Sequence, residues 1–231
     1  AAGARADDAP WLAALRQQAT KEFSEIGLPH RRMEAWKYTD LRALDRAGFA
    51  PAQAGTTVVP PLAYGVGEID EIVILNGLVV EESLRPERFS GITIMSIRTA
   101  LTEAPQVLKN AIGTARPLDR SSLYALNLSL MNDGLVLIAE KGASHPRPIV
   151  LRYVNDSVEP TSVHVRNVIV AGEGAKITLV ENREAGAGAN FLNAVTDLRL
   201  ADAAQVNHYK FDQCSSESLT VTLANADLGA E

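Results

Sequence analysis

A turn motif that recurs through the C-terminal part of this chain restricts its fold more than any other feature. Residues 138–143 read Ile-Ala-Glu-Lys-Gly-Ala and match residues 170–175, which read Val-Ala-Gly-Glu-Gly-Ala. Looser copies begin at Leu200 and Leu223, so the spacings are 32, about 30 and 23 residues. Each copy follows a strand-like alternation of apolar and polar residues, and a further strand pattern usually comes after it. The repeat therefore indicates a periodic β-structure.

Two architectures place strands and tight turns at such intervals. One coil of a β-solenoid plus a variable loop fits these spacings, and small residues at repeated turns suit stacked coils. A Greek-key sandwich is the alternative, because its strands also recur regularly. We favour a solenoid that begins at about Leu135, and two face-packed antiparallel sheets over residues 135–231 would contradict this prediction.

Helical spacing dominates the first part of the chain. After the start signals Asp8 and Pro10, apolar residues recur three or four positions apart: Trp11, Leu15, Ala19, Phe23 and Ile26. Gly27 suits a left-handed helix end, and Pro29 prevents continuation. The sequence therefore predicts one amphipathic helix here.

Further elements follow before Gly134. We expect a short helix capped by Thr39 and ending at Gly48, a helix over residues 101–112 interrupted near Pro105, and a helix over residues 121–131. Asn-Gly at positions 76–77 predicts a hairpin between residues 72–75 and 78–81, and residues 91–97 alternate like a strand. The predicted fold class is α+β. Residues 1–134 form an N-terminal helical domain with a small β-hairpin region, and residues 135–231 form the first coils of a parallel β-helix.

Composition excludes several classes of protein. The 231 residues are 46% hydrophobic and 22% charged, which is enough apolar material for a sizeable core. No apolar run approaches the ~18 residues that a transmembrane helix needs, and residues 1–10 do not resemble a secretory signal. A net charge of −6 and an aromatic content of 5% disfavour a broad nucleic-acid surface. We expect binding to neither nucleic acid nor membrane.

The residues that could carry chemistry are few and separated. Cys214 is the only cysteine, which favours a reducing cytosol and an incidental surface thiol. The four histidines show no metal-ligand spacing: His30, His145, His164 and His208. His164 is expected at an outward-facing position of a strand. Residues 172–176 lack phosphate-loop spacing and are expected to form a turn. The basic cluster of His30, Arg31, Arg32 and Lys37 is expected to be solvated. We therefore assign no catalytic, cofactor-binding or metal-binding residue.

One stretch carries a specific resemblance. Gly-Leu-Pro at 27–29, followed by Arg-Arg-Met-Glu-Ala-Trp-Lys-Tyr-Thr-Asp-Leu at 31–41, resembles the N-terminal signature of the SufD proteins in the SufB/SufD family of iron–sulfur cluster assembly proteins. Residues 73–77, 124–138 and 166–181 resemble further segments of that family in the same order. SufB proteins are a poorer match, because the CxxC-type motif common near their start is missing from this chain.

The resemblance implies an architecture and a role. SufD-like proteins have an N-terminal helical domain, a right-handed parallel β-helix and a C-terminal helical domain, so this sequence is expected to be part of a longer polypeptide. They pair with SufB through the β-helix and with the SufC ATPase through the C-terminal region. The implied function is a cytoplasmic, non-catalytic scaffold subunit, with the Fe–S cluster assembled transiently with SufB and no cofactor held stably. The residues implicated in cluster assembly lie beyond Glu231, so none is transferred to this chain.

An open strand edge and the absence of export signals lead to three further expectations. The isolated chain is expected to self-associate, as a homodimer for example, because an open strand edge is a template for pairing. A β-helix enzyme that acts on polysaccharides would need a secretory route and clustered Asp or Arg residues. An autonomous interaction or adhesin solenoid would also be expected to be exported.

Overall fold

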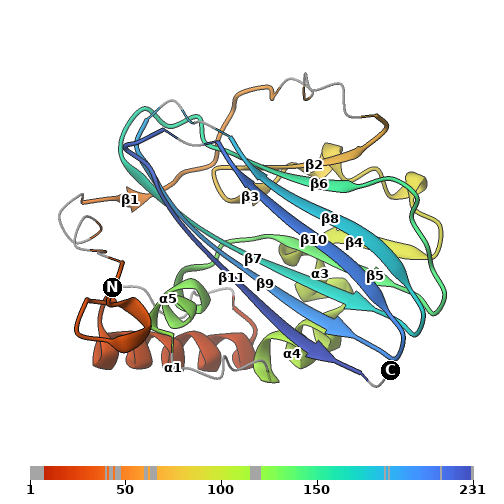
Figure 1. Ribbon diagram of the computed structural model, residues 1–231, viewed down its shortest axis with the longest axis horizontal. Helices are drawn as coiled ribbons and strands as arrows, with labels where there is room; N and C mark the ends of the chain where they lie inside the picture. Colours follow the sequence, from red (N-terminus) through yellow and green to blue (C-terminus); the bar gives the residue numbers. More distant parts are fainter. Residues whose placement is uncertain are drawn as a thin grey trace.

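The computed structural model describes residues 8–39, 41, 44, 48–59, 62, 67–114, 121–184, 186, 188–213 and 215–229. Two β-sheets lie face to face, and helices cover the outer face of one of them (Figure 1). Most of the short helix expected between Thr39 and Gly48 lies outside the described residues, and so does Cys214.

Helices form near residues 10–26 and 121–131 and break at Pro105 as predicted, but the helix expected from Leu101 already begins at Ile97. They are α1 (Pro10–Ile26), α3 (Ile97–Glu103), α4 (Pro105–Thr114) and α5 (Ser122–Leu130), with short 3-10 helices η1 (Glu34–Trp36), η2 (Glu81–Ser83) and η3 (Pro86–Arg88). Ser96 and Ser121 cap α3 and α5 by accepting hydrogen bonds from backbone amides three residues later. Asp8 does not cap α1; its carboxylate pairs with Arg16 Nε at 3.0 Å instead.

From β5 onward, successive strands of the chain alternate between the two sheets. The first contains β4 (Ile92–Ser96), β5 (Leu135–Ala139), β7 (Thr161–Ala171), β9 (Asn190–Leu200) and β11 (Leu219–Leu228), with β1 (Ala50–Pro51) paired to β7. The second contains β2 (Asp70–Leu75), β3 (Leu78–Val79), β6 (Ile149–Val154), β8 (Lys176–Arg183) and β10 (Gln205–Asp212). From β5 onward the neighbours in each sheet are parallel, so successive passages of the chain stack as coils. The predicted β-solenoid within an α+β fold is confirmed.

Stacking in register explains the turn motif. Ala139 lies beside Ala171, and Ala171 lies beside Leu200, so the first motif copies occupy equivalent turns. Gly172 is required by this stacking, since a Cβ there would lie 2.7 Å from the backbone nitrogen of Lys141. The fourth copy was placed wrongly. Leu223 pairs with Val195 in the middle of β11, because its small neighbours are strand residues rather than a turn.

Strands that precede Gly134 also enter the sheets. The hairpin at Asn76 and Gly77 forms as predicted, with both residues at positive φ, and its strand β2 runs parallel to β6. Strand β4 pairs with β5 in the antiparallel direction. The division into domains at residue 134 stays a prediction.

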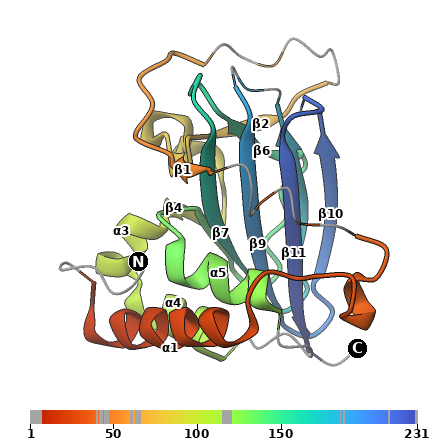
Figure 2. The same cartoon turned by 90° about the vertical axis from the view of Figure 1, so that its left-hand side faces the viewer.

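Apolar side chains form two clusters. The larger fills the space between the sheets, and the smaller lies between the helices and the outer face of the sheet that contains β7. Helix α5 contacts α1 on one side and β7 and β9 on the other (Figure 2). His164 has the outer-face strand position that was predicted, but it is buried because this face is covered. None of the helices in the described part of the chain is long and apolar enough to cross a bilayer.

Candidate functional site

The interior of the solenoid changes from apolar to polar toward its last coil. Side chains of alternate residues point into the solenoid. On three neighbouring strands the inward-facing residues are these: Ile149, Leu151 and Tyr153 of β6; Ile177, Leu179, Glu181 and Arg183 of β8; and Val206, His208, Lys210 and Asp212 of β10. In the strand register, Leu179 lies beside His208, Glu181 beside Lys210, and Arg183 beside Asp212. The last interior contacts are therefore ionic where the earlier ones are aliphatic.

Glu181 is the centre of this polar interior and is only 3% exposed. Its Oε1 accepts hydrogen bonds from Thr196 Oγ1 at 2.6 Å and from the His208 ring at 2.7 Å. Its Oε2 accepts a bond from the Tyr153 hydroxyl at 3.0 Å. Lys210 Nζ lies 3.8 Å from Oε1. A buried carboxylate with this many donors is stabilised in its ionised form.

The pKa values of these groups follow from their surroundings. Burial opposes ionisation of Glu181, but the His208 hydrogen bond and the positive charge of Lys210 outweigh it, so its pKa lies below the usual value. The pKa of Tyr153 is raised well above its usual value, first by burial and then by the negative charge of Glu181. Tyr153 is therefore a fixed hydrogen-bond donor to Glu181 at neutral pH.

A small cavity of about 80 Å³ opens beside this cluster. Arg183 lines it and donates hydrogen bonds to the backbone and side-chain oxygens of Asn190, and its Nη1 lies 3.7 Å from Asp212. The remaining polar walls come from Lys210, Thr220 and other neighbours. The cavity has room for a few waters or a small polar ion. Within the described part of the chain, no three His, Cys, Asp or Glu side chains are grouped to hold a metal.

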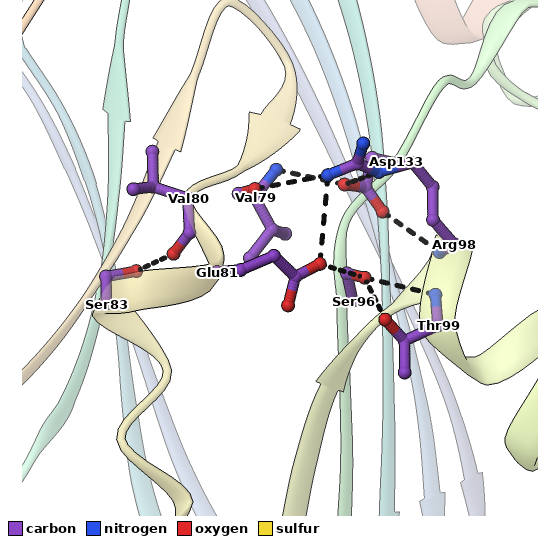
Figure 3. A network of polar contacts seen from close by, with 8 residues as sticks. All are labelled: Val79, Val80, Glu81, Ser83, Ser96, Arg98, Thr99 and Asp133. Carbon is purple, nitrogen blue, oxygen red and sulfur yellow. Dashed lines mark hydrogen bonds and ion pairs between the residues drawn. The ribbon is translucent and has the colours of Figure 1, made fainter.

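A second network joins the helical layer to the start of the solenoid (Figure 3). The fully buried Asp133 carboxylate accepts hydrogen bonds from the backbone amides of Val79 at 3.0 Å and Arg98 at 3.2 Å, and from Arg98 Nε at 2.9 Å. Glu81 extends the network, since its carboxylate accepts a bond from Ser96 at 2.7 Å. Burial raises the pKa of Asp133, although the Val79 amide and the Arg98 charge partly oppose this. This network fixes geometry rather than presenting a reactive group to solvent.

A third polar group lies under α5. Arg166 and Asp197 are both fully buried, with Arg166 Nε 2.7 Å from the Asp197 carboxylate. Arg166 also donates a hydrogen bond to the Tyr124 hydroxyl of α5 and lies over its ring. The pair ties α5 to two neighbouring strands.

The four histidines lie in four different environments. His30 is exposed, and His145 pairs with the buried Asp70 carboxylate at 2.8 Å. His164 is buried at the edge of a phenylalanine ring, and His208 binds Glu181. The basic cluster is exposed at Arg31, Arg32 and Lys37, as expected. Residues 173–174 form the predicted turn.

Sequence reasoning missed Glu181, Asp133 and Asp70 as centres of buried networks. A signal for Glu181 was present, because it continues the inward alternation of Ile177 and Leu179 and an acid at such a position requires partners. Asp133 and Asp70 have hydrogen-bond partners 54 and 75 residues away in the chain, so no local sequence pattern predicts these networks.

Comparison with known proteins places this architecture in a family. Residues 3–151 match the family described as the SufBD protein N-terminal region, and residues 153–231 match the SufBD core domain of SUF system FeS cluster assembly. The chain belongs to the SufBD family. The polar solenoid interior lies within the residues that match the SufBD core, and Asp133 lies within those that match the N-terminal region.

Two curated SufBD relatives illustrate the similarity. The chain is 26% identical over 223 residues to the iron–sulfur cluster assembly SufBD family protein slr0076 of Synechocystis, a match covering 89% of this chain and 48% of that protein. It is 27% identical over 146 residues to the SufBD family protein ABCI9 of Arabidopsis thaliana, covering 62% of this chain and 31% of that protein. The chain therefore spans about half the length of these relatives or less.

Proposed function

We propose that this chain is part of a SufD-type scaffold subunit in SUF iron–sulfur cluster assembly. The observation that carries the proposal is the match of both SufBD regions, consecutively, to a helical layer followed by a β-solenoid. The signature at residues 27–41 favours the SufD branch over SufB, because it resembles the SufD entry motif.

The proposed partners follow from this assignment. SufB would pair with the chain through the β-helix, and the SufC ATPase would bind through a C-terminal region of the whole protein. The Fe–S cluster would be assembled transiently with SufB, as cargo rather than as a resident cofactor. The proposed location is the cytoplasm; one relative, 32% identical over 92 residues, is named as chloroplastic.

The subunit is proposed to be non-catalytic. In support of this, the ionisable groups of the solenoid interior bind one another: Glu181 is engaged by His208 and Tyr153, and Arg183 by Asn190. Such pairs stabilise a stacked coil and leave no obvious free base or nucleophile among them. The β-helix polysaccharide enzyme is a weaker alternative for the same reason.

Co-purification from native cells tests the proposal. A tagged full-length protein should recover an ATPase and a second SufBD protein in fixed stoichiometry, and should restore cluster assembly in a deletion strain. Anaerobically purified protein alone should carry no iron or zinc at one per chain. Recovery of neither partner, together with failure to restore cluster assembly, would refute the scaffold role. A stoichiometric metal lost on Cys214→Ser would refute the absence of a resident cofactor.

A further inference from the structure

One pocket lies outside the solenoid core, against β2 and the segment that contains η2 and η3. Its volume is about 580 Å³, within the range of small-molecule sites. Val73, Val80, Leu84 and Phe89 give it an apolar wall. Arg85 and Arg88, three residues apart, contribute cationic side chains to the same pocket.

Arg85 has a backbone conformation that its side chain does not favour. Its φ of 44° and ψ of 60° are left-handed, a region that glycine and asparagine adopt far more readily. Its exposed guanidinium has no hydrogen-bond or ion-pair partner among the described residues whose interaction would offset the energy of this strain. Strained residues of this kind concentrate where a protein holds a ligand.

Four other charged groups that line the pocket, Asp70, Glu71, Arg88 and Arg152, already form ion pairs. Asp70 accepts hydrogen bonds from Arg88 at 3.0 Å and from Arg147 at 2.8 Å, in addition to His145. Arg152 is held between the carboxylates of Glu71 and Glu184. These ion pairs leave Arg85 as the cation that is available to a ligand.

Glu82 also lines the pocket, and it forms no ion pair with Arg85 within 4 Å. It is the carboxylate that a positively charged group of a ligand would meet. The pocket thus combines an available cation, an available anion and an apolar wall.

We propose that this pocket binds a carboxylate on an aliphatic body. The carboxylate binds Arg85, with Arg88 beside it, and the aliphatic body packs on Val73, Leu84 and Phe89. A fatty acid and an apolar amino acid both have this chemistry, and the amino acid would also offer its ammonium group to Glu82. The proposal is independent of the role in cluster assembly.

Calorimetric titration of the purified chain with octanoate and with leucine tests this site, with octanol as the uncharged control. At least one of the two carboxylates should bind. The one that binds more tightly shows whether the natural ligand resembles a fatty acid or an apolar amino acid. Arg85→Gln should weaken binding by at least about ten-fold, since a charge-assisted contact is lost. Arg32→Gln, at an exposed arginine without a side-chain partner among the described residues, should leave the affinity unchanged.

Arg85→Gly separates a ligand-binding role from a structural one. Glycine adopts this φ without strain, so the variant should lose binding and unfold at an equal or higher temperature. Three results would overturn the proposal: no binding of either carboxylate, octanol binding as tightly as octanoate, or unchanged affinity in Arg85→Gln. A lower unfolding temperature in Arg85→Gly would also overturn it, because Arg85 would then be held by structural contacts.

Discussion

Protonation of His164 should destabilise the fold in mild acid. The ring is 6% exposed on the outer face of β7 and lies edge-on to Phe191, with 5.8 Å between ring centroids. Its Nδ1 has no hydrogen-bond partner in the described structure. Burial lowers the pKa of His164 from its ordinary value of 6.5 to about 4. The folded state therefore keeps this histidine neutral at a pH where the unfolded chain protonates it.

The sign and size of the effect follow from these two pKa values. Between pH 6.5 and pH 4 the unfolded chain binds a proton that the folded chain does not, so stability is complete above pH 6.5 and falls as the pH falls. From pH 7.5 to pH 5.0 this single group should lower the free energy of unfolding by about 2 kcal/mol. Below pH 4 the loss reaches a limit of roughly 3 kcal/mol.

Urea unfolding at pH 7.5 and pH 5.0, followed by circular dichroism, measures the effect. The wild type should lose about 2 kcal/mol more than His164→Gln on this change of pH. His30→Gln is the matched control, because His30 is exposed and its substitution should leave the wild-type loss intact. Equal losses in all three proteins would refute the reasoning. His164→Leu provides a second non-titrating side chain if the glutamine variant folds poorly.

Further predictions concern the buried networks, one close backbone approach and the proposed SufC partner. Asp197→Leu leaves the buried Arg166 without its only carboxylate partner in the described structure and should lower the free energy of unfolding by about 3–5 kcal/mol; a loss under about 1 kcal/mol in urea unfolding would contradict this. Gly134→Ala should lower the free energy of unfolding by at least about 2 kcal/mol, since its Cβ would lie 1.8 Å from a backbone oxygen. Gly142→Ala, which has open space around it, should lower it by about 1 kcal/mol. Glu181→Gln should lower the free energy of unfolding by about 1–3 kcal/mol at pH 7. The difference between wild type and variant should shrink as the pH falls through the lowered pKa of Glu181, below 4.5, whereas a pH-independent difference would exclude the ionised carboxylate as the cause. If the proposed SufD-type role is right, residues 1–231 alone should not stimulate SufC ATP hydrolysis in a steady-state assay, whereas a full-length SufD-type protein should. Equal stimulation by both would place the SufC-binding surface within residues 1–231.

Local patterns in the sequence predicted the elements that local physics specifies. The spacing of apolar residues gave α1 and α5, and Asn76-Gly77 gave a hairpin, because positive φ at both turn positions is accessible to those residues. The turn motif predicted a solenoid, because stacked coils need small residues where one turn packs on the next. The motif failed at Leu223, where small residues belong to a strand interior.

Long-range pairing lay beyond such patterns. The sequence indicated strands at β2 and β4, but not that β2 would lie parallel to β6 or that β4 would pair with β5. Both strands bury apolar faces that several sheet edges could cover equally well. Only the assembled structure selects one edge, because each pairing depends on the position of every other strand.

The sequence by itself determined helices followed by strands with a tight turn about every thirty residues, since period and turn geometry are properties of neighbouring residues. It favoured stacked coils over a sandwich, and the parallel strand pairing decided between them. The tertiary structure decided which polar groups became buried and which partners they met. Glu181 receives donors from residues 15, 27 and 28 positions away, and Asp133 from one 54 positions away. The ionisation of a carboxyl depends on the charges and dipoles within a few ångströms of it, and folding alone brings those groups together.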